Sequence, residues 1–209
     1  ILIRKESFKN VGGFDEGYWN GYEDVDLCFK LQENGWELVY QPQSVVVHYE
    51  SKSGIERFKN INQNIKRLHD LWIGKIKPDI IINKDGTSRD TDANRVQIYF
   101  LPTNKTSEIS RSSYTKKTGV TSIIILTFNQ LSYSIKCLDS LKKYTSDPYE
   151  IILVDNGSTD GTREYLKRFE VDNDHVKLIL NDKNMGFAKG TNQGISRADG
   201  NTILLLNND

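Results

Sequence analysis

The sequence has few cysteines, prolines and methionines, and it has no excess of charge of either sign. Its 209 residues include two cysteines, four prolines and one methionine, and 28 basic side chains balance 28 acidic ones. Two cysteines are too few for a disulfide framework, so we expect both thiols to be reduced. A net charge of zero gives no overall attraction to nucleic acid or to an anionic membrane surface. We therefore expect no nucleic-acid partner.

Long apolar runs are also missing. No stretch approaches the roughly 20 apolar residues that cross a bilayer, and no basic start followed by an apolar core marks a signal peptide. We expect a cytoplasmic protein without a transmembrane segment in this chain, peripheral at most to the inner face of the membrane. The chain begins with Ile1, and residues 1–3 already have the pattern of a strand interior, which indicates a piece of a longer chain.

The second half contains a regular alternation of apolar runs and helical patterns. Four runs rich in Ile, Leu and Val are typical of strands buried on both faces, at 122–126, 150–154, 176–180 and 202–206. Apolar residues recur at helical spacing between them, at 135–141, 162–169 and 187–198. This order predicts right-handed crossovers and an α/β fold with a doubly wound, mostly parallel sheet over residues 120–209.

The first half predicts a mixed α+β segment. A helix is expected over 23–34, ended by Gly35, and a basic amphipathic helix over 55–76. Two strands are expected at 36–40 and 44–47.

The region between the halves indicates a linker. Residues 83–119 are rich in Asn, Asp, Ser, Thr and Lys, with one strand-like island at 96–101. The expected segments are therefore 1–82, 83–119 and 120–209.

Polar and glycine residues follow each of the four expected strands of the second half. Because the carboxyl ends of parallel strands meet at one edge, where open sheets bind ligands, these residues predict a binding site. They are Thr127, Phe128 and Asn129 after the first strand, Asp155, Asn156 and Gly157 after the second, Asn184, Gly186, Phe187, Gly190 and Asn192 after the third, and Asn207 and Asp209 after the fourth. Glycines at a helix start favour phosphate, and a carboxylate favours a hard divalent cation, Mg²⁺ or Mn²⁺.

Taken together, these stretches resemble the nucleotide-sugar half of inverting family-two glycosyltransferases of the GT-A fold. The matching stretches, 123–129, 151–161, 184–194 and 204–209, occur in the expected order. The resemblance implies that Thr127, Asn129 and Asp155 contact the nucleoside of a nucleoside-diphosphate sugar. It also implies that Asp209 is the last acid of the DxD metal motif, whose first acid is replaced here by Asn207.

The first half resembles the acceptor half of the same family, which binds a glycan or lipid-linked acceptor. The resemblance rests on residues 11–16 and on 21–27, which contain the acidic pair Glu23 and Asp24. One carboxylate of this pair is the general base in relatives, and we expect it to be Asp24, with Glu23 as the second choice. The start of a helix favours an ionised acid, which suits proton abstraction. His48 matches the segment that returns a histidine to the metal.

The order of the halves is reversed with respect to one domain of this family. Either the chain is part of a tandem enzyme, with the tail of one catalytic domain followed by the head of the next, or it is a circular permutant. We favour the tandem arrangement because the region that normally joins the two halves is absent. Asp24 and Asp209 then serve different active sites.

The expected function is inverting, metal-dependent sugar transfer in the synthesis of a polysaccharide or cell-envelope glycan. Two alternatives remain open: a non-catalytic module that binds nucleotide sugars, and a nucleotidyltransferase on a similar sheet. The second lacks support because the loop at 127–130 has neither glycine nor lysine.

Overall fold

The computed structural model describes most of both halves and little of the expected linker. The described residues are 1–42, 44, 59–76, 80–82, 85, 87–90, 119–146 and 148–208. Four of the expected features lie wholly or mostly outside them: the strand at 44–47, the island at 96–101, His48 and Asp209.

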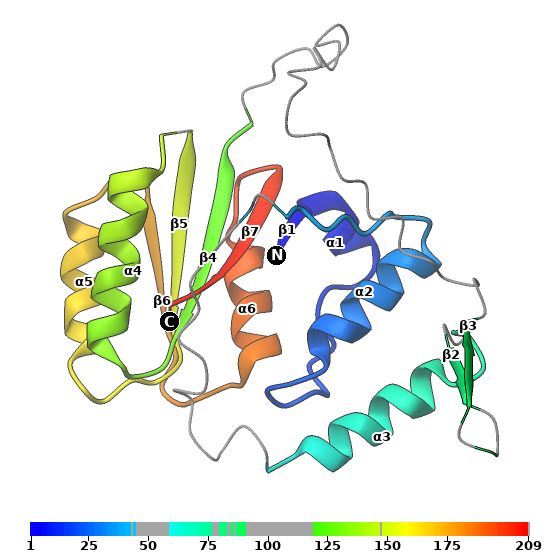
Figure 1. Cartoon of the computed structure of the whole chain (residues 1–209). Helices are drawn as coiled ribbons and strands as arrows, with labels where there is room; N and C mark the ends of the chain where they lie inside the picture. The colour runs from blue at the N-terminus through cyan, green and yellow to red at the C-terminus, as the bar shows by residue number, and fades with distance from the viewer. Residues whose placement is uncertain are drawn as a thin grey trace, which may run out of the picture.

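A five-stranded sheet forms the centre of the molecule (Figure 1). Its strands, in spatial order, are β1 (Leu2–Arg4), β7 (Thr202–Asn207), β4 (Thr121–Thr127), β5 (Tyr149–Asp155) and β6 (Val176–Leu180). The last four are parallel to one another, and β1 alone is antiparallel. The predicted doubly wound, mostly parallel sheet is confirmed.

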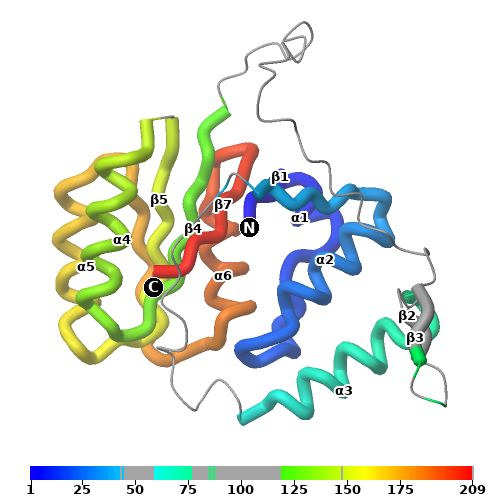
Figure 2. The backbone as a smooth tube through the Cα atoms, viewed as in Figure 1, coloured from blue at the N-terminus to red at the C-terminus, as the bar shows by residue number. Residues whose placement is uncertain are grey.

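Helices cover both faces of this sheet. In the second half they are α4 (Leu131–Tyr144), α5 (Thr162–Val171) and α6 (Phe187–Ser196). α4 and α5 lie on one face and α6 on the other (Figure 2). Alternate strand residues enter the two cores, so that Ile123 and Ile125 pack on the side of α4 and α5, and Ile124 packs on the side of α6. Because both faces are covered, the strands carry the continuous apolar runs that identify them in the sequence.

The strand order places a topological switch point between β4 and β7. From β4 the chain runs outward through β5 to β6, and α6 then returns it to β7 on the other side of β4. Open α/β sheets bind ligands outside the strand carboxyl ends at such a point.

The described part of the first half contains three helices and a small hairpin. They are α1 (Lys5–Asn10), α2 (Glu23–Glu33), α3 (Ile61–Trp72), β2 (Ile80–Ile82) and β3 (Ser88–Asp90). α2 has its predicted position, and Gly35 follows it in the left-handed region, at φ 78°. β2 and β3 pair with each other, so the hairpin extends across the expected segment boundary at residue 83.

Some expectations for the first half are wrong. Residues 36–40 form no strand, and Val39 and Tyr40 are 78% and 66% exposed. Among the described residues no strand pairs with 36–40, and strand-forming residue types alone do not make a strand without such a partner. α1 was not anticipated, because six residues with one core side chain, Phe8, give no periodic signal. α3 begins at Ile61, because residues 59–60 form a turn.

The two halves share one hydrophobic core. Ile3, Phe8 and Phe14 of the first half pack in the same cluster as Ile124 and Ile195 of the second. β1 also extends the sheet, with Ile3 opposite Ile203. No helix in the described part of the chain is long and apolar enough to cross a membrane.

Candidate functional site

The strand register brings the predicted site residues of the second half to one edge of the sheet. Thr127 at the end of β4 lies opposite Asp155 at the end of β5, and Asp155 lies opposite Leu180 at the end of β6. On the other side of β4, Leu126 lies opposite Asn207 of β7. The loops after all four strands therefore meet at the switch point.

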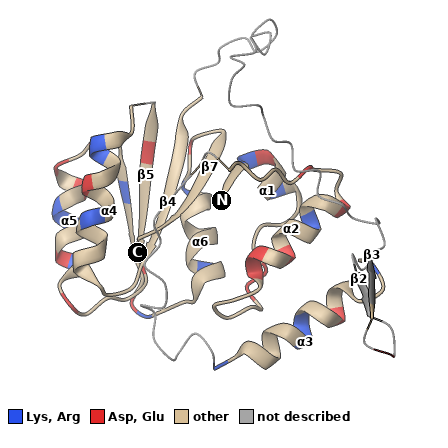
Figure 3. Ribbon diagram, in the orientation of Figure 1, with Lys and Arg blue, Asp and Glu red and all other residues tan. Residues whose placement is uncertain are grey.

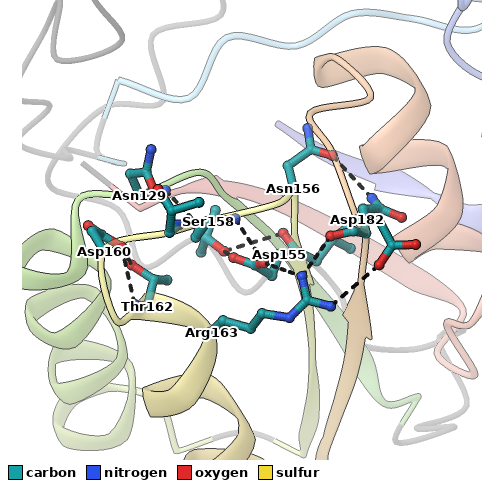
Figure 4. Close-up of polar contacts among 12 residues, drawn as sticks. Asn129, Asp155, Asn156, Ser158, Asp160, Thr162, Arg163 and Asp182 are labelled. Carbon is teal, nitrogen blue, oxygen red and sulfur yellow. Dashed lines mark hydrogen bonds and ion pairs between the residues drawn. The ribbon is translucent and has the colours of Figure 1, made fainter.

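Asp155 is the buried acid at the centre of this edge (Figure 4). Ser158 N donates to its Oδ2 at 3.1 Å, and Thr127 Oγ1 donates to its Oδ1 at 3.4 Å. Arg163 Nη1 lies 3.9 Å from Oδ2. These neighbours orient the carboxylate.

Arg163 is a site residue that the sequence interpretation missed. Its Nη1 donates to Asn181 O at 2.9 Å, and its Nη2 lies 3.8 Å from Asp182 Oδ1. The guanidinium therefore connects the loops after β5 and β6 (Figure 4). A cation in the first turn of a helix opposes the helix dipole, and this is the signal by which Arg163 could have been found.

The loops after β4 and β5 are joined by side chains of both. Asn129, in the left-handed region at φ 56°, accepts from Thr159 N at 2.8 Å through its Oδ1. Asn129 N donates to Ser158 Oγ at 2.7 Å. Asp160 accepts from Leu131 N at 3.1 Å and from Thr162 N at 3.2 Å, so one carboxylate serves the starts of α4 and α5. Desolvation raises the pKa of Asp160, but the hydrogen bond from the Thr162 hydroxyl and those from the two N–H groups outweigh it and lower the pKa.

Asn156 holds the loop after β6 through hydrogen bonds of its side-chain amide. Its Nδ2 donates to Asn184 Oδ1 at 3.0 Å and to Gly186 O at 3.2 Å. Its Oδ1 accepts from Asn181 Nδ2 and from Met185 N, both at 3.1 Å. All four hydrogen-bonding positions of this buried amide are occupied by protein groups. Asn156 and Asn184 thus fix the loop after β6.

At each of the predicted glycines a side chain would meet a different neighbour. A Cβ on Gly157 would lie 2.8 Å from Lys183 Cα, so two loops of the site approach there. A Cβ on Gly190 would lie 2.6 Å from Leu126 Cδ1, so this glycine lets α6 pack closely on the sheet. Gly186 faces Trp19 of the first half, whose Cε3 and Cζ3 lie 3.2 Å from the position of a Cβ.

Asn192 and Phe187, both predicted to bind nucleotide, contact the first half. Asn192 Nδ2 donates to Phe14 O at 2.9 Å, and its Oδ1 accepts from Phe14 N at 3.2 Å. The rings of Phe187 and Phe14 meet edge to face, with centroids 5.8 Å apart. Phe187 N donates to Asn20 Oδ1 at 3.1 Å. Of the remaining predicted residues, Phe128 is 47% exposed and Asn207 is exposed.

The acidic pair of the first half divides into one buried and one exposed carboxylate. Glu23 is 7% exposed and accepts from Gly21 N at 2.6 Å. Asp24 is exposed, and its Oδ1 accepts from Val25 N at 2.9 Å. Both lie in the first turn of α2, which follows Tyr22 in the left-handed conformation. Asp24 is the better placed of the two to meet an external hydroxyl.

α3 holds the loop that precedes this pair. Asn64, which is 3% exposed, accepts from Trp19 N at 3.2 Å and donates to Trp19 O at 2.9 Å. Arg67 Nε and Nη2 donate to Asp15 Oδ2 at 2.9 and 2.7 Å. Burial raises the pKa of Asp15, but the hydrogen bonds from Gly17 and Arg67 lower it overall.

The same helix also holds α2 itself. Trp72 Nε1 donates to Asp26 Oδ1 at 2.8 Å, and Lys30 Nζ lies 2.7 Å from Asp26 Oδ2. Asp26 is fully buried, and Tyr18 packs in the loop that α3 covers, with the pKa of its phenol raised by desolvation and by the nearby Asp26. The charges of this helix were interpreted from the sequence as a solvated face. The contacts that Asn64 and Arg67 make with the loop before α2 were therefore not predicted.

A metal centre is not assembled by the described residues. Within them, no three His, Cys, Asp or Glu side chains lie close enough to hold a metal ion. The two predicted ligands, His48 and Asp209, lie outside the described residues.

The fold and this cluster define an α/β protein of the doubly wound class, with a polar site at the switch point where such sheets bind nucleotides. Comparison with known proteins then shows which families the two halves are similar to. The profile described as "Glycosyl transferase family 2" matches residues 122–209. The profile described as "N-terminal domain of galactosyltransferase" matches residues 1–70. The glycosyltransferase resemblance of both halves is thereby confirmed.

Individual relatives agree with the family profiles. The chain is 25% identical over 222 residues to an uncharacterized glycosyltransferase of Rickettsia bellii, an alignment that covers 100% of this chain and 30% of the relative. It is 45% identical over 53 residues to N-acetylglucosaminyl-diphospho-decaprenol L-rhamnosyltransferase of Mycobacterium tuberculosis, covering 25% of this chain and 17% of the relative. The chain thus spans under a third of either relative's length.

A solved structure is also similar. TarS 1-349 of S. aureus in complex with UDP-GlcNAc has 27% sequence identity and a TM-score of 0.40, with 43% of this chain and 26% of that chain covered.

Proposed function

We propose that the chain supplies the donor-binding and acceptor-binding parts of a glycosyltransferase that uses a nucleoside-diphosphate sugar. The observation that carries this proposal is the set of hydrogen bonds between α6, on the donor side, and the loop between α1 and α2, on the acceptor side. Asn192 bonds both the N–H and the C=O of Phe14, and Asn20 accepts from Phe187 N. Transfer requires a donor and an acceptor hydroxyl held in one rigid frame, and these contacts make such a frame.

The donor nucleoside binds at the carboxyl ends of β4 and β5 in this proposal. Asp155 accepts from the edge of the base, and Thr127 and Asn129 lie beside it on the neighbouring strand end. The exposed ring of Phe128 offers an apolar face next to them. Arg163 is a positioning residue here, since it holds the loop after β6 and stands 3.9 Å from the Asp155 carboxylate.

Asp24 acts as the general base. Its exposed carboxylate stands in the first turn of α2, where an acceptor hydroxyl can reach it. It removes the proton of the acceptor hydroxyl as that oxygen bonds to the anomeric carbon. The bond from that carbon to the diphosphate breaks on the opposite face, so the configuration inverts and the nucleoside diphosphate leaves.

The proposal includes a divalent cation, Mg²⁺ or Mn²⁺, which Asp209 and His48 would hold. When bound, such a cation neutralises the charge that develops on the departing diphosphate. Asn208 Nδ2 donates to Ser134 Oγ at 3.0 Å, which fixes the residue before Asp209 against α4.

A second candidate is the tandem arrangement, in which segments 1–82 and 120–209 are the acceptor side of one family domain and the donor side of the next in a longer enzyme of glycan or cell-envelope synthesis, so that Asp24 and Asp209 serve different active sites. The Rickettsia bellii glycosyltransferase supports this, because it aligns with the whole of this chain in the same order within a longer sequence. The shared core of the two halves instead supports the single site proposed first, because it holds both parts in one folded unit.

The proposal is tested by calorimetric titration of the 209-residue chain with UDP, GDP and dTDP, with and without Mn²⁺, followed by transfer assays with the matching nucleotide sugars. We expect micromolar binding of one nucleotide that Mn²⁺ strengthens, and an increase in its Kd of at least tenfold in Asp155→Asn. Lys142→Gln, exposed in the last turn of α4 and away from the strand carboxyl ends, is the control. Absence of nucleotide binding by the unsubstituted chain would overturn the proposal.

A further inference from the structure

Asn181 and Gln193 form a reciprocal pair of side-chain amides that no step of the proposed function uses. Asn181 directly follows β6, and Gln193 lies near the end of α6. Asn181 Nδ2 donates to Gln193 Oε1 at 2.8 Å, and Gln193 Nε2 donates to Asn181 Oδ1 at 3.2 Å. Two hydrogen bonds between the same two amides fix their distance and also their relative orientation. The pair therefore joins α6 to the loop after β6.

Asn181 is hydrogen-bonded through each of its polar groups. Its N–H donates to Asp155 O at 2.9 Å, and its C=O accepts from Arg163 Nη1 at 2.9 Å. Its Nδ2 also donates to Asn156 Oδ1 at 3.1 Å. The residue is 9% exposed, and a buried amide that loses its partner costs more than the hydrogen bond itself contributes. Asn181 thus connects Gln193 to the two charged residues at the centre of the site.

Gln193 is a firm anchor because α6 is held on two sides. The absence of a side chain at Gly194 lets the helix lie close to the sheet. On the other side, Asn192 bonds both the N–H and the C=O of Phe14 in the first half. The helix is almost without charge (Figure 3), since Lys189 is its only ionisable side chain. Amide hydrogen bonds and apolar contacts therefore set its position, and Gln193 passes that position on to Asn181.

The series of contacts ends at the carboxylate that binds the nucleobase in the proposed function. Arg163 Nη1, which donates to Asn181 O, lies 3.9 Å from Asp155 Oδ2 (Figure 4). The attraction between these two charges depends on their separation. Because the backbone of Asn181 bonds to both residues, a shift of Asn181 moves the guanidinium and the start of the Asp155 loop together. The geometry of the base site therefore depends on where Asn181 is held.

We propose that Asn181 and Gln193 are positioning residues that hold Asp155 and Arg163 in the geometry that selects the nucleobase. A base is selected by hydrogen bonds to its edge, and these require the protein groups to be placed within about 0.5 Å. The amide pair acts through Asp155 and Arg163 and does not itself contact the nucleotide. The inference rests on the proposed function and adds to it the contacts that set selectivity among nucleotides.

The test breaks the pair and then rebuilds it. Gln193→Leu keeps the size of the side chain but removes its amide, and Gln193→Asn leaves the amide one methylene short of Asn181. The double variant Asn181→Gln/Gln193→Asn restores the combined length of the pair. Gln32→Leu, at an exposed position of α2, is the matched control for the first change.

The affinity readout is calorimetric titration of each full-length variant with UDP, GDP and dTDP. We expect Gln193→Leu and Gln193→Asn to raise the Kd of the preferred nucleotide about five- to tenfold and to change the other two less. The double variant should recover most of the selectivity, and Gln32→Leu should behave as the parent. Loss of stability alone would not change selectivity. An unchanged Kd in Gln193→Leu, or equal weakening of all three nucleotides without recovery, would overturn the inference.

A second measurement needs no nucleotide. The backbone N–H of Ser158 donates to Asp155 Oδ2 at 3.1 Å, so its NMR resonance reports the position of that carboxylate. We expect the resonance to shift in Gln193→Leu, to return toward the parent value in the double variant and to stay in place in Gln32→Leu. A resonance that does not move in Gln193→Leu would overturn the inference. If it moves but the parent chain binds no nucleotide, the proposed function alone is overturned.

Discussion

Glu23 and Asp24 are adjacent acids with different environments, and this difference separates their roles. Asp24→Asn keeps the size of the exposed side chain but removes its basicity. We expect kcat for transfer to fall about 10²- to 10⁴-fold in this variant, with an unchanged melting temperature. Glu23→Gln weakens the hydrogen bond from Gly21 N and should cost about 1 kcal/mol, which lowers Tm by roughly 2–4 °C. Transfer rates and thermal melts of both variants check this. The reverse pattern would make Glu23 the base.

Glu150 is a buried acid near the start of β5, at the opposite end of the strands from the site. It accepts from Ser122 Oγ at 2.6 Å and from Asp199 N at 2.6 Å, and it lies 2.7 Å from Lys177 Nζ. Desolvation alone would raise its pKa, but the hydrogen bonds from Lys177, Ser122 and the backbone lower it to about 2. Through these partners the carboxylate ties together β4, β5, β6 and the turn before β7.

This lowered pKa predicts how stability depends on pH. An unfolded glutamate titrates at about 4.3. Because the folded pKa is lower, the ionised Glu150 stabilises the fold above that pH, and the stabilisation is lost as the pH falls toward 2. In urea unfolding at pH 7 we expect Glu150→Gln to lose about 2 kcal/mol, and below pH 4 the difference from the parent should shrink. Exposed Glu164→Gln is the control. A constant difference down to pH 2 would contradict the assignment.

At the scale of elements, α6 can approach the sheet only because of its glycines. A Cβ on Gly194 would lie 2.6 Å from Ile124 Cγ2 and 3.0 Å from Val154 Cγ2, both in the centre of the sheet. Gly194→Ala improves helix propensity but overfills this contact. We expect a net loss of about 1–3 kcal/mol in chemical unfolding and a weaker affinity for nucleotide, because α6 carries Gly186 at its start. Lys189→Ala, exposed on the same helix, should be neutral. A stabilised Gly194→Ala would show that α6 can move outward without cost.

The sequence was sufficient for the elements of the second half because their signal is local. Each buried strand is a run of Ile, Leu and Val, and each strand end carries its polar residues directly after it, as Asp155 does. The roles of Asn156 and Asn192 could not be predicted in this way, because an asparagine that binds a ligand and one that braces a loop look alike in sequence. Asn192 meets Phe14 across 178 positions of chain. Asn64 was hidden for the same reason, since its partners lie 43 and 45 residues away.

At the scale of the whole molecule, the central question is whether the halves form one cooperative unit. Phe14 lies at their junction, with its ring against Phe8 at 5.4 Å and against Phe187 at 5.8 Å between centroids. It is 2% exposed, and its backbone is bonded at both ends by Asn192. A shared core of this kind couples the unfolding of the two halves, because neither can keep its buried surface without the other.

Phe14→Ala tests this coupling with two probes that report on different halves. All three tryptophans, Trp19, Trp36 and Trp72, lie in the first half, so their fluorescence reports its unfolding. Hydrogen exchange of the amides in β4 and β5 reports on the second half. We expect the variant to lose about 3–5 kcal/mol by both probes, with coincident midpoints, because removal of the ring leaves a cavity in the common core. Val171→Ala, at an 82% exposed position, should change neither probe. If fluorescence shifts while β4 and β5 keep their protection, the halves are independent, and Asp24 and Asp209 serve different active sites as the tandem arrangement predicts.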